Sequence, residues 1–264
     1  MRYVDAHVHL SDPEYESSVD KILEDARRSS IVALVSNSMN LSTSLRSIEL
    51  AEKYPRFVYA ALGIHPWNVK ELEQNELERT IDLINSHCQN RGVVAIGEIG
   101  LDYKYLKSDK KELMNRQYEV FCKMLQLSEK LSLPAVIHSR GTTQEIMNML
   151  PSYNIERVLL HWFSNPIELL PEITEREYYI TEGPAIIFSD HIQEIVRQIP
   201  LTNLLTETDG PVRFFKPPFK GKMATPADIP VVTEVVAKIK GKERMEVAEQ
   251  IYRNFTTFFR TDQV

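Results

Sequence analysis

The chain alternates short apolar runs with longer stretches in which apolar residues recur every three or four positions. The short runs are nearly continuous in hydrophobicity and rich in β-branched or aromatic residues, which is typical of parallel strands buried on both faces. We predict eight such strands, at residues 3–9, 31–36, 57–62, 93–98, 133–138, 157–161, 178–182 and 203–207.

The stretches between these runs have the period of amphipathic helices. We predict helices at residues 40–54, 81–88, 113–131, 190–199, 229–239 and 243–259. Strands that alternate with helices along one chain favour a single α/β domain over residues 1–264, a closed (β/α)8 barrel. The alternative is an open doubly wound sheet, which usually has a Gly-rich phosphate loop after its first strand, and this sequence has none there.

Histidines and carboxylates stand at the ends of the predicted strands. In a (β/α)8 barrel the carboxyl ends of all strands meet on one face, where catalytic residues lie. Residues i and i+2 of a strand point to the same side, so His7 and His9 present two imidazoles to one cation. The strand ends therefore predict a metal centre, with the ligands His7, His9, Glu98, His138, His161 and Asp209.

The size of this ligand set indicates two metal ions. Six nitrogen and oxygen ligands exceed the three protein ligands of a typical mononuclear catalytic zinc site. Glu98 lies midway around the predicted barrel and is the natural bridging ligand, and Asp5 is expected to orient an imidazole. Imidazole with carboxylate favours Zn²⁺, Mn²⁺, Fe²⁺ or Co²⁺ over a purely oxygen-ligated site, and Mg²⁺ stays among the candidate ions.

Two metal ions indicate a hydrolytic reaction. They polarise an electrophilic oxygen and lower the pKa of a bound water, so that metal-bound hydroxide is available near neutrality. Asp209 can take the proton as this nucleophile attacks. The residues alone leave the substrate open among a phosphoester, an amide and a carboxylic ester. A non-catalytic scaffold is the alternative from another class, and the complete ligand set argues against it.

Six ordered blocks resemble the TatD family of metal-dependent hydrolases, (β/α)8 barrels of the amidohydrolase superfamily. The blocks are DAHVHL (5–10), GIHP (63–66), GEIGLDY (97–103), IHSR (137–140), HWFS (161–164) and ETDGP (207–211). The resemblance implies a metal-dependent deoxyribonuclease, often a 3′–5′ exonuclease on single-stranded DNA. Trp162 and Asn165 depart from the Cys and Gly that the family commonly has there, and these departures bear on the identity of the substrate.

The resemblance also assigns roles to individual residues. One metal ion would be held by His7, His9, Glu98 and Asp209, and the other by Glu98, His138 and His161. His65 resembles a family histidine near the scissile phosphate, with a structural loop histidine as the alternative. The residues expected to take part in catalysis are Asp209, Glu98 and His65.

The segment 210–222 combines four cations, no acid and three phenylalanines. Cations beside rings are typical of single-strand nucleic-acid binding, in which a stacked base contributes ~1–3 kcal/mol. Because the segment follows Asp209, we expect it at the barrel mouth. The predicted substrate contacts are His65, Arg140, Arg213, Phe214, Lys216, Lys220 and Lys222. The alternatives are a Pro-stiffened lid with packed rings and solvated lysines and, for Arg140, a salt bridge to a neighbouring loop.

Composition adds limits on partners and location. The 264 residues are 43% hydrophobic and 26% charged, an ordinary globular balance, and the net charge of −6 argues against nonspecific coating of nucleic acid. No run approaches the ~20 apolar residues needed to span a bilayer. We therefore expect a cytoplasmic enzyme that acts on DNA, with no membrane association and no obligate protein partner.

Overall fold

The computed structural model describes residues 1–104, 106 and 110–261. In this part of the chain eight parallel strands form one sheet, in the order of the sequence. They are β1 (Tyr3–Val8), β2 (Ile31–Asn37), β3 (Val58–Leu62), β4 (Val93–Asp102), β5 (Ala135–Arg140), β6 (Val158–Leu160), β7 (Tyr179–Glu182) and β8 (Leu204–Thr206).

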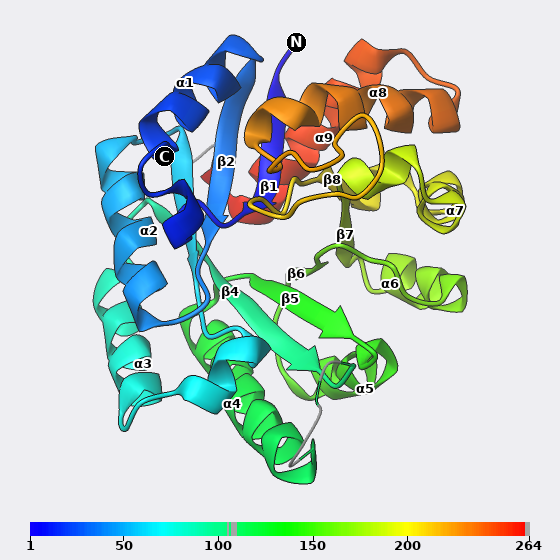
Figure 1. The fold of residues 1–264 in the computed structure, drawn as a ribbon. Helices are drawn as coiled ribbons and strands as arrows, with labels where there is room; N and C mark the ends of the chain where they lie inside the picture. Colours follow the sequence, from blue (N-terminus) through cyan, green and yellow to red (C-terminus); the bar gives the residue numbers. More distant parts are fainter. Residues whose placement is uncertain (105, 107–109, 262–264) are drawn as a thin grey trace.

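Hydrogen bonds that follow β8 connect the last strand back to the first. The Asp209 N–H donates to the carbonyl of His7 (2.9 Å), and the His9 N–H donates to the carbonyl of Gly210 (2.8 Å). The sheet thus closes into a barrel, seen from its outside in Figure 1. The predicted (β/α)8 fold is confirmed.

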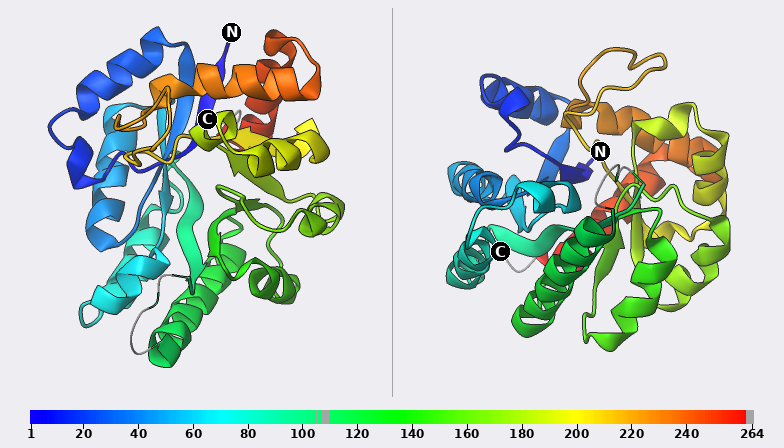
Figure 2. Two further views of the ribbon diagram at one scale, coloured as in Figure 1. Left: turned by 45° about the vertical axis from the view of Figure 1, so that its right-hand side comes forward. Right: turned by 60° about the horizontal axis from the view of Figure 1, so that its bottom comes forward.

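Helices cover the outside of the strands, as the two further views in Figure 2 show. α1, α5 and α6 were not predicted, although α1 buries Val19, Ile22, Leu23 and Ala26 at helical spacing. The bounds are α1 (Val19–Arg28), α2 (Leu41–Lys53), α3 (Glu76–His87), α4 (Lys110–Leu131), α5 (Thr143–Met149), α6 (Leu170–Glu175), α7 (Asp190–Gln198), α8 (Ile229–Lys240) and α9 (Arg244–Phe259). Short 3₁₀ helices lie in several connections, among them η2 (Pro66–Glu71) after β3.

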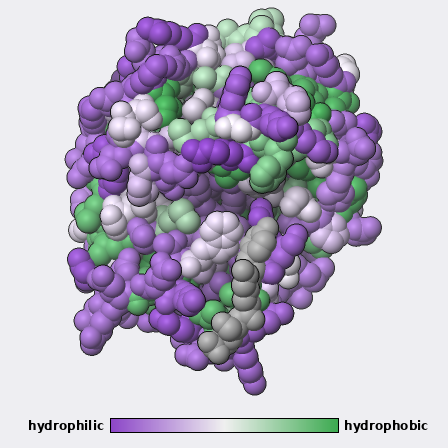
Figure 3. Space-filling model, viewed as in Figure 1, coloured by the Kyte–Doolittle hydropathy of each residue, from purple (hydrophilic) through white to green (hydrophobic). Residues whose placement is uncertain are grey.

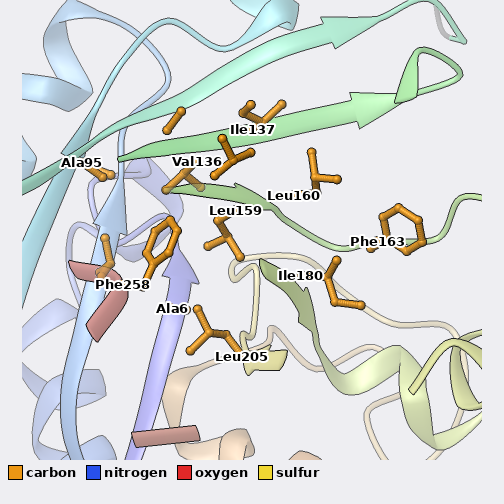
Figure 4. Close-up of a cluster of buried hydrophobic side chains, with 14 of the residues drawn as sticks. Ala6, Ala95, Val136, Ile137, Leu159, Leu160, Phe163, Ile180, Leu205 and Phe258 are labelled. Carbon is orange, nitrogen blue, oxygen red and sulfur yellow. The ribbon is translucent and has the colours of Figure 1, made fainter. Parts of the chain in front are cut away.

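Apolar side chains from the strands form the core. Every position of β1, β3, β4, β6 and β8 is buried, as the continuous hydrophobicity of these runs predicts. Figure 4 shows part of this packing, with buried side chains from six strands and Phe258 of α9. The core leaves the polar residues at the carboxyl ends of the strands as the chemical end of the barrel.

Strand β4 differs from the prediction, because it continues four residues beyond Glu98 to Asp102. Its pairing with β5 shifts register between Ile96 and Ile99, and such an irregularity re-aims the side chains within it. Gly100 permits the close approach of the two strands: its φ is +152°, and a Cβ there would lie 2.0 Å from the carbonyl oxygen of His138. The irregular segment therefore carries Glu98 inside a strand, beside His138.

The connection from β8 to α8 is long and crosses the front of the barrel in Figure 1, where it is gold. An antiparallel bridge pairs Arg213 with Met223, which makes a small hairpin of the basic segment 210–222. No helix in the described residues is long and apolar enough to cross a membrane.

Candidate metal centre

Four buried donor atoms lie together where β1, β4 and the segment after β8 meet. His7 Nε2 lies 3.2 Å from His9 Nε2, 3.2 Å from Glu98 Oε2 and 3.4 Å from Asp209 Oδ1. His9 Nε2 lies 3.2 Å from the same two carboxylate oxygens. Ligands that bind a tetrahedral zinc ion at about 2.0–2.1 Å lie roughly 3.3 Å from one another. Five of the six distances among these four atoms therefore match the spacing of tetrahedral zinc ligands.

A second donor set lies on the other side of Glu98. Glu98 Oε1 is 2.9 Å from His138 Nδ1 and 2.7 Å from His161 Nε2, and these two nitrogens are 3.3 Å apart. His65 Nε2 lies 3.2 Å from Glu98 Oε1 and 3.2 Å from His138 Nδ1. The structure thus brings all six predicted ligands together with His65, in two groups that share one carboxylate.

Burial and charge fit two cations. Each of the six predicted ligands is a residue no more than 8% exposed. Within the described part of the chain Glu98 Oε2 makes no hydrogen bond, and a buried carboxylate oxygen left so is costly unless a cation compensates it. Two carboxylates converging with four imidazoles offer the nitrogen and oxygen donors that Zn²⁺ and neighbouring divalent ions bind.

Hydrogen bonds to the far nitrogens orient two of the imidazoles. His9 Nδ1 donates to the carbonyl of Asn37 (2.9 Å), which leaves the Nε2 lone pair for a metal ion. Asp102 Oδ2 accepts from His138 Nε2 (3.1 Å), so that the lone pair of His138 is on Nδ1. In the neutral rings of His9 and His138, the nitrogen that faces the donor set is therefore the one without a proton. Glu207 Oε2 lies 3.4 Å from His161 Nδ1, which makes no hydrogen bond within the described residues.

The carboxylates of the site are held in their charged form. Burial alone would raise the pKa of Glu98, but the surrounding imidazoles outweigh burial and lower it well below its usual range. Burial likewise opposes the charge of Asp209, and a hydrogen bond from His9 with the neighbouring imidazoles lowers its pKa. Burial disfavours a charged His9, but Asp209 and Glu98 raise its pKa to about 10. The first donor set therefore favours a positive charge at its centre.

His65 differs from the predicted histidine ligands in which ring nitrogen carries its proton. Its Nδ1 accepts the backbone N–H of Trp67 (3.1 Å), so a neutral His65 carries its proton on Nε2, the atom that faces Glu98. Burial lowers the pKa of His65 to about 4, and the neutral form is the one present near pH 7. An Nε2–H group donates a hydrogen bond and has no lone pair for a metal ion. His65 is thus suited to a negatively charged substrate oxygen.

Asp5 does not have the contact expected from the sequence. Its carboxylate accepts the backbone N–H groups of His7 (3.2 Å) and Thr208 (3.1 Å), and the Thr208 hydroxyl as well. In the described residues His7 Nδ1 has no hydrogen-bond partner. Asp5 therefore joins the end of β1 to the segment that carries Asp209, and it orients backbone rather than an imidazole.

A cavity of about 480 Å³ opens over the two donor sets. In Figure 3 this face of the molecule is hollowed near its centre, with hydrophilic residues around the hollow. The cavity combines apolar side chains with both signs of charge. Beyond the donor residues, it is lined by Met39, Trp67, Trp162, Val212 and Phe215, by Arg140 and Arg213, and by Asp12 and Glu14.

The basic segment contributes to the cavity only in part. Arg213 lines it but pairs with Glu14 (2.5 Å). Phe214, predicted as a substrate contact, is 6% exposed, packs against the rings of Trp162, Phe188 and Phe219, and does not line the cavity. Its neighbour Phe215, which is 89% exposed, lines the cavity instead.

The remaining predicted substrate contacts divide between the cavity and the surface around it. Arg140 lines the cavity, with its guanidinium 5.6 Å from the ring centre of Trp162. Lys216, Lys220 and Lys222 are exposed on the hairpin and do not line the cavity.

Several residues that support the site were not predicted from the sequence. Asp102 and Glu207 flank the far nitrogens of His138 and His161, and both belong to the blocks that carry the family resemblance. Trp67, half exposed in η2, lines the cavity and donates its indole N–H to Asp102 (2.7 Å). Glu182 is fully buried behind Glu207, with both oxygens unpartnered among the described atoms. Their signal was an acid or aromatic residue close to a ligand in the sequence or at the end of a strand.

Comparison with known proteins gives consistent results over the whole chain. The family described as TatD related DNase matches residues 4–260. The "uncharacterized metal-dependent hydrolase MJ1582" of Methanocaldococcus jannaschii is 34% identical over 98% of this chain and 98% of its own length. The human protein named deoxyribonuclease TATDN3 is 31% identical over 97% of this chain and 94% of its own length.

A solved structure has the same fold. YJJV, a TatD homologue from Escherichia coli, superimposes with a TM-score of 0.89 at 26% identity, over 98% of each chain. Sequence and structure comparisons thus point to the same family.

Proposed function

This chain belongs to the TatD family of metal-dependent hydrolases, and from that premise we propose that it cleaves phosphodiester bonds in DNA with two divalent metal ions. We further propose that it is a 3′–5′ exonuclease that prefers single strands or strand ends. The human relative at 31% identity is named a deoxyribonuclease, which supports DNA as the substrate.

The observation that carries the proposal is the position of the Glu98 carboxylate. Its Oε2 faces the nitrogens of His7 and His9, and its Oε1 faces those of His138 and His161. One carboxylate with an oxygen in each donor set suits a bridge between two ions. We assign His7, His9, Glu98 and Asp209 to the first ion and Glu98, His138 and His161 to the second.

When bound, the two ions polarise the phosphoryl oxygen and lower the pKa of a water molecule. The chain's own residues supply the other parts of the reaction. Asp209 is ionised and opens to the cavity, so its carboxylate can accept the proton of the attacking water. His65 donates its Nε2–H to a phosphate oxygen, where negative charge develops as the bond to the leaving oxygen breaks.

The cavity supports a single-stranded substrate. Its volume of about 480 Å³ is that of a small-molecule site, which suits one unstacked nucleotide better than a paired and stacked duplex. Phe215 offers an exposed ring on which a base can stack, and Arg140 offers a cation for a neighbouring phosphate. The exposed Lys216, Lys220 and Lys222 extend this positive charge outward along the hairpin.

The proposal is tested with end-labelled single- and double-stranded DNA, offered with Mn²⁺, Mg²⁺ or Zn²⁺. A 3′–5′ exonuclease shortens a 5′-labelled strand into a ladder and releases a 3′-labelled nucleotide at once. Endonucleolytic products, or release from the 5′ end, would refute the exonuclease polarity.

Two variants separate the site from the rest of the enzyme. Asp209→Asn should lose at least 10²-fold in kcat, as expected when a general base is removed. Asp82→Asn, an exposed control on α3, should retain wild-type rates. Chromogenic ester and amide substrates run beside the DNA test the alternative chemistry of the same site. If DNA stays intact with every metal ion while an ester or amide is hydrolysed, the nuclease proposal is refuted in favour of that alternative.

A further inference from the structure

Four side chains form a closed circuit of contacts beside the second donor set. The Trp67 indole N–H donates to Asp102 Oδ2 (2.7 Å), and the same oxygen accepts from His138 Nε2 (3.1 Å). His138 Nδ1 lies 3.2 Å from His65 Nε2, and His65 Nδ1 accepts the backbone N–H of Trp67 (3.1 Å). A residue that lines the cavity is thus connected in two ways to an imidazole of the metal centre.

Further hydrogen bonds fix Asp102 and the segment that carries Trp67. The Asp102 N–H donates to Gln117 Oε1 of α4 (3.0 Å), and Gln117 Nε2 donates to the carbonyl of Pro66 (3.1 Å). Asp102 Oδ1 accepts the N–H of Lys104 (3.1 Å). Hydrogen bonds therefore connect Asp102 through Gln117 to the residue before Trp67, and both Asp102 oxygens already accept hydrogen bonds.

The chemistry of these groups allows one arrangement of protons. An indole nitrogen only donates, and a carboxylate only accepts, so the proton of His138 must be on Nε2. The Asp102 carboxylate accepts from Nε2, so it holds the His138 ring and raises the basicity of Nδ1, the atom that faces Glu98.

We propose that Asp102 is a positioning residue for the second metal ion, and that Trp67 holds Asp102 in place while forming a side of the substrate cavity. The inference rests on the proposed function, because it requires a metal ion on His138. Metal binding at the second site is then coupled to the substrate side of the cavity. By thermodynamic reciprocity, substrate binding then raises the affinity of the second metal site by the same factor by which the second metal ion raises the affinity for substrate.

The first test measures two stepwise Co²⁺ affinities in the full chain, from the absorption bands of the bound ion. In Asp102→Asn the amide NH₂ faces an N–H group whichever way the amide is turned, because both Asp102 oxygens accept hydrogen bonds. The variant should therefore weaken one of the two Co²⁺ binding steps 10–100-fold. The other step should stay within twofold. Trp67→Phe keeps a ring but loses the indole N–H, and should weaken the same step less. Asp82→Asn is the matched surface control.

The second test uses the fluorescence of Trp67. The chain has two tryptophans, so a Trp162→Phe background leaves Trp67 as the reporter. Its emission should shift with the second equivalent of Zn²⁺, and the shift should vanish when Asp102→Asn is added at equal Zn²⁺ occupancy. A merely structural Asp102 would lower Tm and leave this signature intact.

The outcomes distinguish the inference from the proposed function. A wild-type chain that binds fewer than two ions overturns both. Two ions bound with unchanged affinities in folded Asp102→Asn overturn the inference and leave the proposed function standing. If Asp102→Asn fails to fold, Trp67→Phe decides: unchanged affinity in both steps overturns the inference, and selective weakening of one step supports it.

Discussion

Two adjacent phenylalanines should respond in opposite ways to replacement by alanine. Phe215 is 89% exposed at the cavity, so Phe215→Ala should leave Tm nearly unchanged. If a base stacks on this ring, removing ~1–3 kcal/mol of stacking corresponds to a roughly 5- to 150-fold higher KM for single-stranded DNA. Because stacking binds substrate away from the reacting bond, kcat should change little.

Phe214 provides the matched control. It is 6% exposed among three other rings, and replacing such a side chain by Ala costs ~3–5 kcal/mol of stability. Phe214→Ala should therefore lower Tm by roughly 6–20 °C, at about 2–4 °C per kcal/mol for a chain of this size.

The assay compares an end-labelled oligonucleotide with the same strand lacking its terminal bases. Phe215→Ala should raise KM for the first substrate only, since the second offers no base to stack. An equal rise on both substrates, or none on either, would refute stacking on Phe215. A drop in Tm for Phe215→Ala as large as that for Phe214→Ala would refute the packing described for the hairpin.

Three further predictions concern ions and charge. Chelation should abolish hydrolysis and lower Tm, because the ions bind only the folded chain, and Mn²⁺ should restore both; unchanged Tm would contradict this. Replacing Lys216, Lys220 and Lys222 by Ala should reduce the log–log salt slope of single-strand binding by about 0.7 for each phosphate that these lysines neutralise, while an unchanged slope would exclude such a role. Burial, with the charge of Glu207, raises the pKa of Glu182 well above its usual 4.5, so ionisation on raising the pH costs stability. In the metal-depleted protein Glu182→Gln should therefore gain Tm over wild type progressively from pH 5 to pH 8, and a constant difference would contradict the assignment. The control for the lysine triple is the replacement of Lys53, Lys130 and Lys238, exposed lysines in the last turns of α2, α4 and α8.

Much of the barrel could be predicted because buried parallel strands have a strong local pattern. All eight predicted runs coincide with observed strands, and the long amphipathic helices were found as well. The helices α5 and α6 are seven and six residues long, too short to show a clear period. The extension of β4 past Glu98 depends on a register irregularity with β5, which is a property of two strands together.

The cluster of proposed ligands could be predicted because each of these residues stands at or near a strand end, where barrel geometry brings them together. Which ring of the hairpin is buried could not be predicted, because Phe214 and Phe215 are adjacent and chemically identical in the sequence. Only the packing of Phe188 and Trp162 around one of them decides which ring is buried. The role of Asp102 likewise depends on contacts with His138 and Trp67, which come from other strands and connections.

The most direct test of the account is an anomalous-scattering measurement on crystals grown with Mn²⁺. The account predicts two metal peaks, each within about 2.0–2.3 Å of a different oxygen of Glu98. The first peak should be bound by His7, His9 and Asp209, and the second by His138 and His161, with His65 outside both ligand sets. A single peak, two peaks without Glu98 between them, or His65 as a metal ligand would contradict it.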